Sequence, residues 1–361
     1  MTCIALNEEI IAVTKGHYID CYDGENHRIV NVTSNNSQND DKVTDIVISS
    51  DGKYLAAITS SSKKLIVYNL STLKEEKVYT IPRSASKIRF TVDNSNILVA
   101  DKTGDGLIYN LLSEGSGTKL LGHLSLLLNI LQSQDGKYII TSDRDEKIRV
   151  TCYPNSYAIK TYCLGHTEFV NHIELLPHNV KYLMSTSGDG TIRCWDYEMD
   201  VKDESLYEEF KNTMDKEGVE VEKLPVVHFA IEKLNDSCSI IAVCIHLLKK
   251  ILFYSIKSNN EQFVHKLVTT LDINDEPMAI KFRNSSLFVY FNNCEISQYD
   301  IKSNNLHITV DFVMKINVFN SVDISSINPN IESSIKVLYK RKFDNVQEYQ
   351  ERKKQRLGIK E

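Results

Sequence analysis

Residues 119–197 read KLLGHLSLLLNILQSQDGKYIITSDRDEKIRVTCYPNSYAIKTYCLGHTEFVNHIELLPHNVKYLMSTSGDGTIRCWDY. This stretch contains one unit twice: Gly-His at 122–123 returns 43 residues later at 165–166, and Lys-Tyr at 137–138 returns 44 residues later at 181–182. Within each copy, short runs of β-branched and apolar residues alternate with turn residues, which predicts strands with one buried face. The stretch therefore predicts two copies of one small β-sheet.

The length and the ends of the unit indicate its type. A repeat of roughly 40–45 residues that opens with Gly-His and closes with Trp-Asp, here at 195–196, is typical of a WD-repeat blade. A single blade leaves the faces of its sheet uncovered, so blades stack radially around an axis and form a propeller. About seven units take roughly 300 residues, so we expect this chain to form an all-β, seven-bladed WD-repeat β-propeller.

We expect residues 1–340 to form this propeller as a single domain, interrupted by two stretches of different composition. Residues 23–41 are rich in Asn, Ser and Asp, which predicts a polar loop. Residues 198–222 hold ten acidic residues and three lysines, which predicts an acidic connection between blades. A short helix over 205–214 is expected within this connection.

The end of the chain is expected to close the ring and then to leave it. Residues 310–319 and 334–339 are the candidates for closure, by pairing with the first strands. Residues 341–361 predict a basic amphipathic helix and tail, because a capping box and a partial apolar stripe occur there. The basic residues that are candidates for contact with RNA or a partner are Lys340, Arg341, Lys342, Arg352, Lys353 and Lys354. A helix that simply packs on the propeller explains the same residues.

Four residues of the second copy have a structural explanation. In WD repeats the His of Gly-His, a Ser or Thr, the turn Asp and the Trp form an internal hydrogen-bonded chain. The matching residues are His166, Ser185, Asp189 and Trp195. Ser, His and Asp also form the triad of many hydrolases. We prefer the structural interpretation, because the repeat accounts for all four positions without a pocket.

Composition excludes several classes of protein. The formal net charge of −6 argues against electrostatic binding of nucleic acid by the chain as a whole, so any RNA contact is local or shared with a basic partner. Eight cysteines without a CxxC pair predict buried free thiols in a reducing compartment. We predict no membrane span and no signal peptide, because the apolar runs are short and the N-terminus lacks a basic flank. The expected compartment is the nucleus, with the cytoplasm as the alternative.

Several runs resemble one particular family, the WD-repeat, non-catalytic subunit of tRNA (guanine-N7) methyltransferase. The resemblance covers residues 98–197 and 338–357, and DRDEKIRV is its most specific part because generic repeats place small turn residues there. The runs that carry it are LLGHLSLLLNI at 120–130, ITSDRDEKIRV at 140–150, CLGHTEFV at 163–170, SGDGTIRCWDY at 187–197 and LYKRKFDNVQEYQERKKQRL at 338–357.

The resemblance implies a scaffold that binds and stabilises a separate S-adenosylmethionine-dependent enzyme. That enzyme forms N7-methylguanosine in the variable loop of tRNA, and the propeller helps to position the tRNA. The chain itself is then not an enzyme and binds no cofactor, since S-adenosylmethionine belongs to the catalytic partner. In agreement, the sequence has no Gly-x-Gly-x-x-Gly between a predicted strand and a helix.

The resemblance also implies a docking flank on the charged strand of the first strong repeat. The matching residues are Arg149, Lys147 and Asp145, with Arg144 nearby, and Arg149 is the main candidate for pairing with a partner carboxylate. Structural explanations exist for two of them. Asp145 aligns with Asp189 and fits an internal network, and Arg149 aligns with Arg193, an ordinary outward-facing repeat residue.

Two other functions remain open on the sequence. One is a WD-repeat interaction scaffold for another complex, such as a substrate receptor of a ubiquitin ligase. Many such receptors carry Arg two residues after Trp-Asp, whereas Trp195-Asp196 is here followed by Tyr197-Glu198. The other is an enzyme, which requires convergent catalytic groups at the mouth of the propeller. The sequence shows none that the repeat does not already explain.

Overall fold

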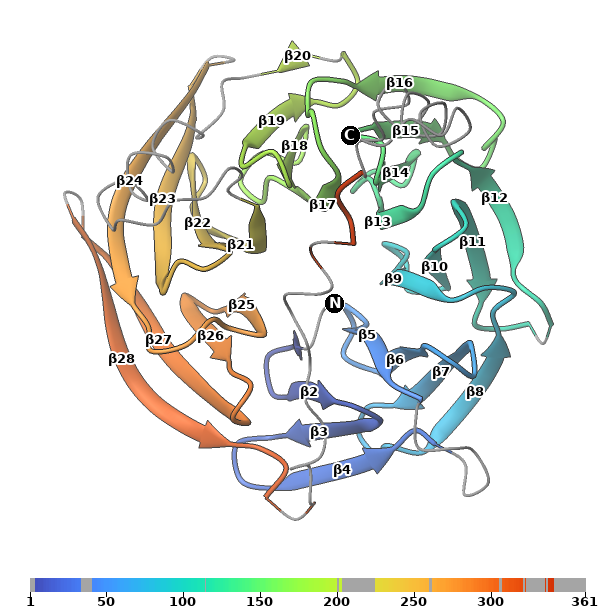
Figure 1. The fold of residues 1–361 in the computed structure, drawn as a ribbon, viewed down its shortest axis with the longest axis horizontal. Coiled ribbons are helices and arrows are strands. Elements are labelled where there is room, and N and C mark those ends of the chain that lie inside the picture. Colours follow the sequence, from blue (N-terminus) through green and yellow to red (C-terminus); the bar gives the residue numbers. More distant parts are fainter. Residues whose placement is uncertain are drawn as a thin grey trace, which may run out of the picture.

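A computed structural model confirms the seven-bladed β-propeller (Figure 1). It describes residues 4–33, 41–113, 115–199, 201–202, 225–259, 262–304, 307–320, 322, 335 and 337–340, and every element in these ranges is a strand. In each blade four consecutive strands pair antiparallel in chain order, with the first strand nearest the axis and the fourth at the rim. The helices predicted at 205–214 and in the tail 341–361 lie outside the described residues.

The first four blades follow the chain without interruption by other elements. Blade 1 contains β1 (Ile4–Leu6), β2 (Ile11–Lys15), β3 (Tyr18–Tyr22) and β4 (His27–Asn31), and blade 2 contains β5 (Val43–Ile48), β6 (Tyr54–Thr59), β7 (Lys64–Asn69) and β8 (Glu75–Thr80). Blade 3 contains β9 (Ala85–Phe90), β10 (Asn96–Asp101), β11 (Asp105–Asn110) and β12 (Thr118–Gly122), and blade 4 contains β13 (Leu127–Gln132), β14 (Tyr138–Asp143), β15 (Ile148–Cys152) and β16 (Ile159–Cys163).

The last three blades complete the ring. Blade 5 contains β17 (Val170–Leu175), β18 (Tyr182–Ser187), β19 (Ile192–Asp196) and β20 (Val201–Lys202). Blade 6 contains β21 (Val226–Asn235), β22 (Cys238–Ile245), β23 (Lys250–Asn259) and β24 (Gln262–Asp272), and blade 7 contains β25 (Ala279–Arg283), β26 (Ser286–Tyr290), β27 (Glu295–Asn304) and β28 (His307–Asn317). We call the face that carries the turns between second and third strands the upper face.

The turns between first and second strands explain why the Asp-Gly signals recur. Before β14, the Ser133 hydroxyl donates to the Asp135 carboxylate at 2.6 Å, and Gly136 adopts a φ of +73°. Before β6, Asp51 and Gly52 form the same turn, with a φ of +70° at the glycine. Because this part of the left-handed region favours glycine, the pattern marks a tight turn even where Trp-Asp is absent.

The core lies between the blades, as expected of sheets that must cover each other's faces. Each of the buried apolar clusters found among the described residues joins one blade to the next around the ring. Between blades 4 and 5, for example, Ile148 and Val150 of β15 pack in one cluster with Trp195 and Tyr197. The indole of Trp195 in blade 5 therefore packs in the cluster that supports β15, the strand that carries Arg149.

The ring closes in a way that the sequence analysis did not predict. The expected pairing of the last strands with the first was wrong, because β28 pairs with β27 inside blade 7 and β1 pairs with β2 inside blade 1. Closure depends instead on a shared apolar cluster of these two blades and on a few polar contacts. The backbone N–H of Phe319 donates to Asp20 at 2.7 Å, and the Lys15 ammonium donates to the carbonyl of Asn292 at 2.7 Å.

Replacing Asp20 by alanine is expected to weaken this closure strongly. The carboxylate is 0% exposed and also pairs with His27 at 3.1 Å, so its loss leaves the buried N–H of Phe319 without an acceptor. We expect the free energy of unfolding to fall by about 3 kcal/mol in urea titrations. The control is Asp311→Ala, which removes an exposed ion pair with Lys302 at the rim and is expected to change the free energy of unfolding little. Equal losses for both variants would contradict this role.

Candidate partner-docking site

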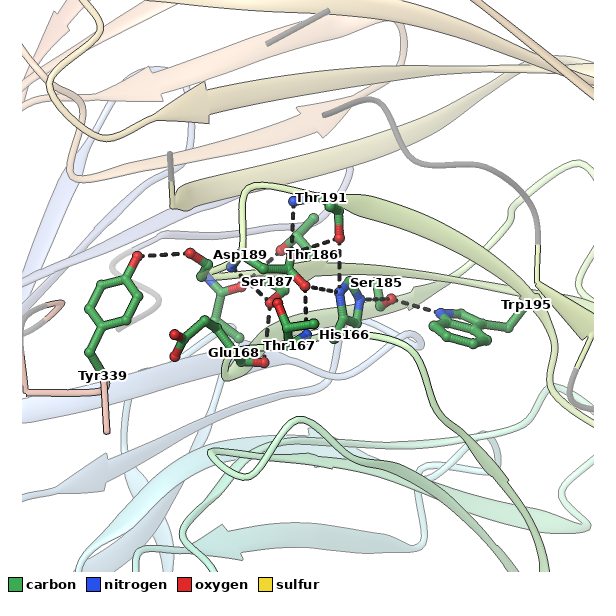
Figure 2. A network of polar contacts seen from close by, with 12 residues as sticks. His166, Thr167, Glu168, Ser185, Thr186, Ser187, Asp189, Thr191, Trp195 and Tyr339 are labelled. Carbon is green, nitrogen blue, oxygen red and sulfur yellow. Dashed lines mark hydrogen bonds and ion pairs between the residues drawn. The ribbon is translucent and has the colours of Figure 1, made fainter. Parts of the chain in front are cut away.

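A hydrogen-bonded chain runs through blade 5 and contains the four residues assigned to a structural network (Figure 2). The Trp195 indole N–H donates to the Ser185 hydroxyl at 2.8 Å, and the Ser185 oxygen lies 2.7 Å from Nε2 of His166. Nδ1 of His166 lies 3.1 Å from the carboxylate of Asp189. The chain thus ties β18 and β19 to the segment that precedes β17.

The pKa shifts within this hydrogen-bonded chain are those expected of a structural element. Burial lowers the pKa of His166, so its imidazole stays neutral and donates through Nδ1 to Asp189. Burial is the largest single influence and would raise the pKa of the Asp189 carboxyl, but His166, Thr191 and the N–H of Thr167 together outweigh it, and the net shift is downward. The Ser185 hydroxyl is fully buried and already accepts from Trp195, so no substrate can reach it. These three residues therefore form no hydrolase triad.

Blade 4 contains a shorter hydrogen-bonded chain of the same kind, in which the aspartate comes from a different position of the repeat. His123 contacts Asp143 at 2.9 Å through Nδ1 and Thr141 at 2.9 Å through Nε2. Asp143 aligns with Ser187 of blade 5, whereas Asp145 aligns with Asp189. The interpretation that Asp145 belongs to an internal network is therefore wrong, because Asp143 takes that role and leaves the side chain of Asp145 on the upper face.

Arg149, the main candidate for partner docking, lies on β15 and is only 8% exposed. Its Nε donates to the Thr151 hydroxyl at 3.2 Å, and one terminal nitrogen donates to the carbonyl of Gly122 at 3.0 Å. A guanidinium carries five N–H donors. The described residues supply acceptors for two of them, which holds the guanidinium in a fixed plane.

The other predicted docking residues lie on the turn between β14 and β15. Lys147 is exposed, and Arg144 is half-buried with an Nε that has no hydrogen-bond partner among the described residues. The backbone of this turn is fixed, because Asp143 accepts hydrogen bonds from the N–H groups of Asp145 and Lys147 at 2.8 and 3.0 Å. The structure therefore places Arg144, Asp145 and Lys147 on one rigid turn of the upper face, which leads directly into the strand of Arg149.

Of the six basic residues proposed near the C-terminus, the structure describes Lys340 alone. Its ammonium lies 2.6 Å from Glu146 and 3.6 Å from Asp145, so it is paired within the chain. Tyr339 lies against blade 5, where Figure 2 shows it beside the polar network. The sequence predicts ring closure for residues 334–339, and nothing in it indicates the contact of Lys340 with the docking turn. The remaining five, Arg341, Lys342, Arg352, Lys353 and Lys354, lie outside the described residues.

A second polar cluster lines the inner strands. Lys87 of β9 pairs with Asp45 of β5 at 3.0 Å, and Arg89 pairs with Glu174 of β17. His172 and His228 contact backbone carbonyls of the next blade, those of Val227 at 3.0 Å and Pro277 at 2.8 Å. These contacts link blades 2, 3, 5, 6 and 7 around the axis, so the cluster is explained by ring assembly.

The inner histidines predict a stability that falls in mild acid. Burial lowers the pKa of His172 to about 3 and that of His228 to about 4, whereas both titrate near 6.5 in the unfolded chain. Between pH 6.5 and about 4 these histidines are therefore protonated in the unfolded state but neutral in the folded state. The free energy of unfolding consequently decreases as pH decreases. We expect a loss of about 3 kcal/mol between pH 6.5 and 5. Urea titrations of His172→Gln with His228→Gln should show a flatter profile, and His265→Gln on β24 should not. An unchanged slope would contradict the assignment.

Other kinds of site are not supported by the part of the chain that the structure describes. No group of three or more His, Cys, Asp or Glu side chains there could hold a metal ion. Within the same ranges, no helix is long and apolar enough to cross a membrane. The cysteines found there, among them Cys21 and Cys244, form no disulfide with one another.

Comparison with known proteins finds one family model and curated relatives of the same kind. The model of the family described as tRNA methyltransferase TRM82 WD40 domain matches residues 22–119 and 112–310. A curated relative from Aedes aegypti, "tRNA (guanine-N(7)-)-methyltransferase non-catalytic subunit wuho", is 31% identical over 349 residues, which cover 85% of this chain and 77% of the relative. A second from Xenopus laevis, "tRNA (guanine-N(7)-)-methyltransferase non-catalytic subunit wdr4", is 42% identical over 167 residues, 46% of this chain and 42% of the relative.

A solved structure supports the architecture alone. A chain in the "Crystal Structure of Mitotic Checkpoint Complex" superposes with a TM-score of 0.66 at 10% sequence identity, and the match covers 81% of this chain and 86% of that one. At this level of identity the likeness shows that both chains are propellers, and it carries no functional argument.

Proposed function

The chain belongs to the non-catalytic, WD-repeat subunits of tRNA (guanine-N7) methyltransferase, and from this premise we propose how it holds its catalytic partner. The proposed docking site is the flank of blade 4 formed by Arg149 on β15 and the turn with Arg144, Asp145 and Lys147. The partner binds S-adenosylmethionine and methylates N7 of a guanine in the variable loop of tRNA. The propeller is the scaffold that stabilises it.

The observation that supports this site most is the way in which Arg149 is held. The Gly122 carbonyl and the Thr151 hydroxyl fix the guanidinium before a partner arrives, so binding costs little side-chain entropy. A carboxylate of the partner then accepts two N–H groups in one plane, in a setting from which water is largely excluded. Such a preorganised pair determines both affinity and orientation.

We propose that tRNA binds to the complex and only weakly to this chain. The formal net charge of −6 opposes association with phosphates, and Lys340, one of the proposed RNA contacts, is paired with Glu146. The propeller contributes by fixing the orientation of the catalytic subunit, with the basic tail residues as local phosphate contacts. We also propose the nucleus as the compartment, on the basis of the same basic clusters.

Both parts of the proposal are tested by binding measurements on purified proteins. Calorimetry of the propeller with the cognate catalytic subunit is expected to give a stable one-to-one complex. Filter binding with tRNA at 50 and 200 mM salt is expected to show tight, salt-dependent binding by the complex and weak binding by the propeller alone. Tight binding of tRNA by the propeller alone would contradict the second part, and absence of a complex would contradict the first. A ubiquitin-ligase receptor is not favoured, because the family match is to a methyltransferase subunit.

A further inference from the structure

The C-terminal segment crosses the upper face of the ring. We call Ile335 and residues 337–340 the C-terminal strap. Ile335 packs against the apolar cluster shared by blades 6 and 7, whereas Tyr339 contacts blade 5 and Lys340 contacts blade 4. Figure 1 shows this red segment running from the middle of the ring to β17 and onward to the side of β14. The strap thus reaches the docking turn from the opposite side of the propeller.

Tyr339 anchors the strap to a rigid part of blade 5. Its hydroxyl donates to the carbonyl of Gly188 at 2.8 Å, and its ring meets that of Phe169 edge to face at a centroid distance of 5.0 Å. Only glycine fits at position 188, because a Cβ added there would lie 2.3 Å from the ring of Phe169. Burial raises the pKa of Tyr339, so the hydroxyl stays a donor at neutral pH. The anchor therefore fixes where the next residue, Lys340, can reach.

Lys340 places its charge between two carboxylates of the docking turn. It lies 2.6 Å from Glu146 and 3.6 Å from Asp145, and the three side chains are 43%, 35% and 32% exposed. The hydrogen bond to Glu146 raises the pKa of Lys340, which keeps it charged. A half-exposed pair of this kind adds little to folding stability. Its larger consequence concerns the charge that the turn presents to another molecule.

Without the strap, the turn would present Asp145 and Glu146 without a paired cation, on the segment that leads into the strand of Arg149. A partner that uses a carboxylate to bind this arginine would then meet like charges beside its target, and like-charge contacts at an interface are costly. With Lys340 in place, both carboxylates have a cation beside them, and the exposed Lys147 adds a second positive charge to the turn.

We propose that the C-terminal strap is a component of the docking surface, in which Lys340 offsets part of the negative charge of Asp145 and Glu146 so that blade 4 accepts an acidic patch of the catalytic subunit. Lys340 is on this account a positioning and charge-compensating residue, not a contact for RNA. The inference rests on the proposed function, since it concerns the same flank and the same partner.

The test is a charge-swap series in the full-length chain, measured by calorimetry against the catalytic subunit. Lys340→Glu is expected to weaken binding about tenfold at 100 mM salt and much less at 500 mM, because exposed charges are screened. Lys340→Glu combined with Glu146→Lys restores a cation beside a carboxylate and is expected to bind within about threefold of wild type. Lys302→Glu, which breaks a pair of the same type with Asp311 at the rim, is the matched control and is expected to bind normally.

The outcomes separate this inference from the proposal on which it rests. Wild-type affinity for Lys340→Glu, or a loss that Glu146→Lys does not restore, would overturn the role of the strap. If Arg149→Glu abolishes binding while the Lys340 variants bind normally, the docking site stands and the strap is structural only. If neither variant changes the affinity, the proposed docking site itself fails. Thermal unfolding of each variant shows that any loss of binding is not a loss of fold.

Discussion

Arg149→Glu is expected to abolish binding of the catalytic subunit, with a loss of affinity of at least about a hundredfold. The change removes the planar donors that Gly122 and Thr151 hold in position, and it places a negative charge opposite the partner carboxylate. In a mixture with tRNA, the catalytic subunit should then behave as if the propeller were absent. Calorimetry measures the affinity, and size-exclusion chromatography measures complex formation.

Two variants control for this prediction. Arg193→Glu makes the same change at the equivalent position of β19, one blade further, and is expected to leave binding within about threefold of wild type. Arg149→Lys keeps the charge but loses the bidentate geometry, so we expect an intermediate loss of about tenfold. Equal effects of Arg149→Glu and Arg193→Glu would show that charge reversal anywhere on the propeller disturbs binding, and would contradict a specific pair at Arg149.

The second large effect is expected for the indole at the centre of blade 5. Trp195→Ala should lower the free energy of unfolding by about 4 kcal/mol, because it leaves a cavity in the cluster between blades 4 and 5 and removes a donor to Ser185. The same cluster supports Ile148 and Val150 of β15, so the docking strand should also loosen. Hydrogen exchange of β15 is expected to accelerate more than that of β7.

The matched control for Trp195 is an exposed aromatic residue. Tyr157 is 87% exposed on the connection between β15 and β16, and Tyr157→Ala is expected to change stability by about 0.5 kcal/mol or less. Urea unfolding of the three proteins under one set of conditions gives the comparison. A loss below about 1 kcal/mol for Trp195→Ala would show that the cluster collapses around the gap, contrary to the close packing described above.

Much of the fold followed from local patterns that the chain repeats. The repeated Gly-His and Lys-Tyr pairs and the Trp-Asp pair predicted blades 4 and 5, including the hydrogen-bonded chain of blade 5. The structure shows that the turn of Asp135 recurs at Asp51 in blade 2. Ring closure did not follow, because it depends on contacts between residues far apart in the sequence. Asp20 and Phe319 are 299 residues apart, and nothing in the local sequence of either residue indicates the other.

For a similar reason, only part of the candidate site could be predicted from the sequence. Alignment of the two repeats paired Asp145 with Asp189, but in blade 4 His123 contacts Asp143, two residues earlier. Asp143 ends β14, whereas Asp145 lies on the turn that follows, so strand periodicity could not show which of the two aspartates reaches the histidine. The contact of Lys340 with Glu146 joins residues 194 positions apart, and it became visible only once the strap was seen to cross the ring.

The most direct test of the central claim is the rate of N7-methylation of tRNA by the cognate catalytic subunit, with and without this chain. Three reactions supplied with S-adenosylmethionine and tRNA are compared: the catalytic subunit alone, this chain alone, and the two together. We predict no methylation by this chain alone, little by the catalytic subunit alone, and a large increase when both are present. Equal rates with and without the propeller, or methylation by this chain alone, would contradict its role as a non-catalytic scaffold subunit.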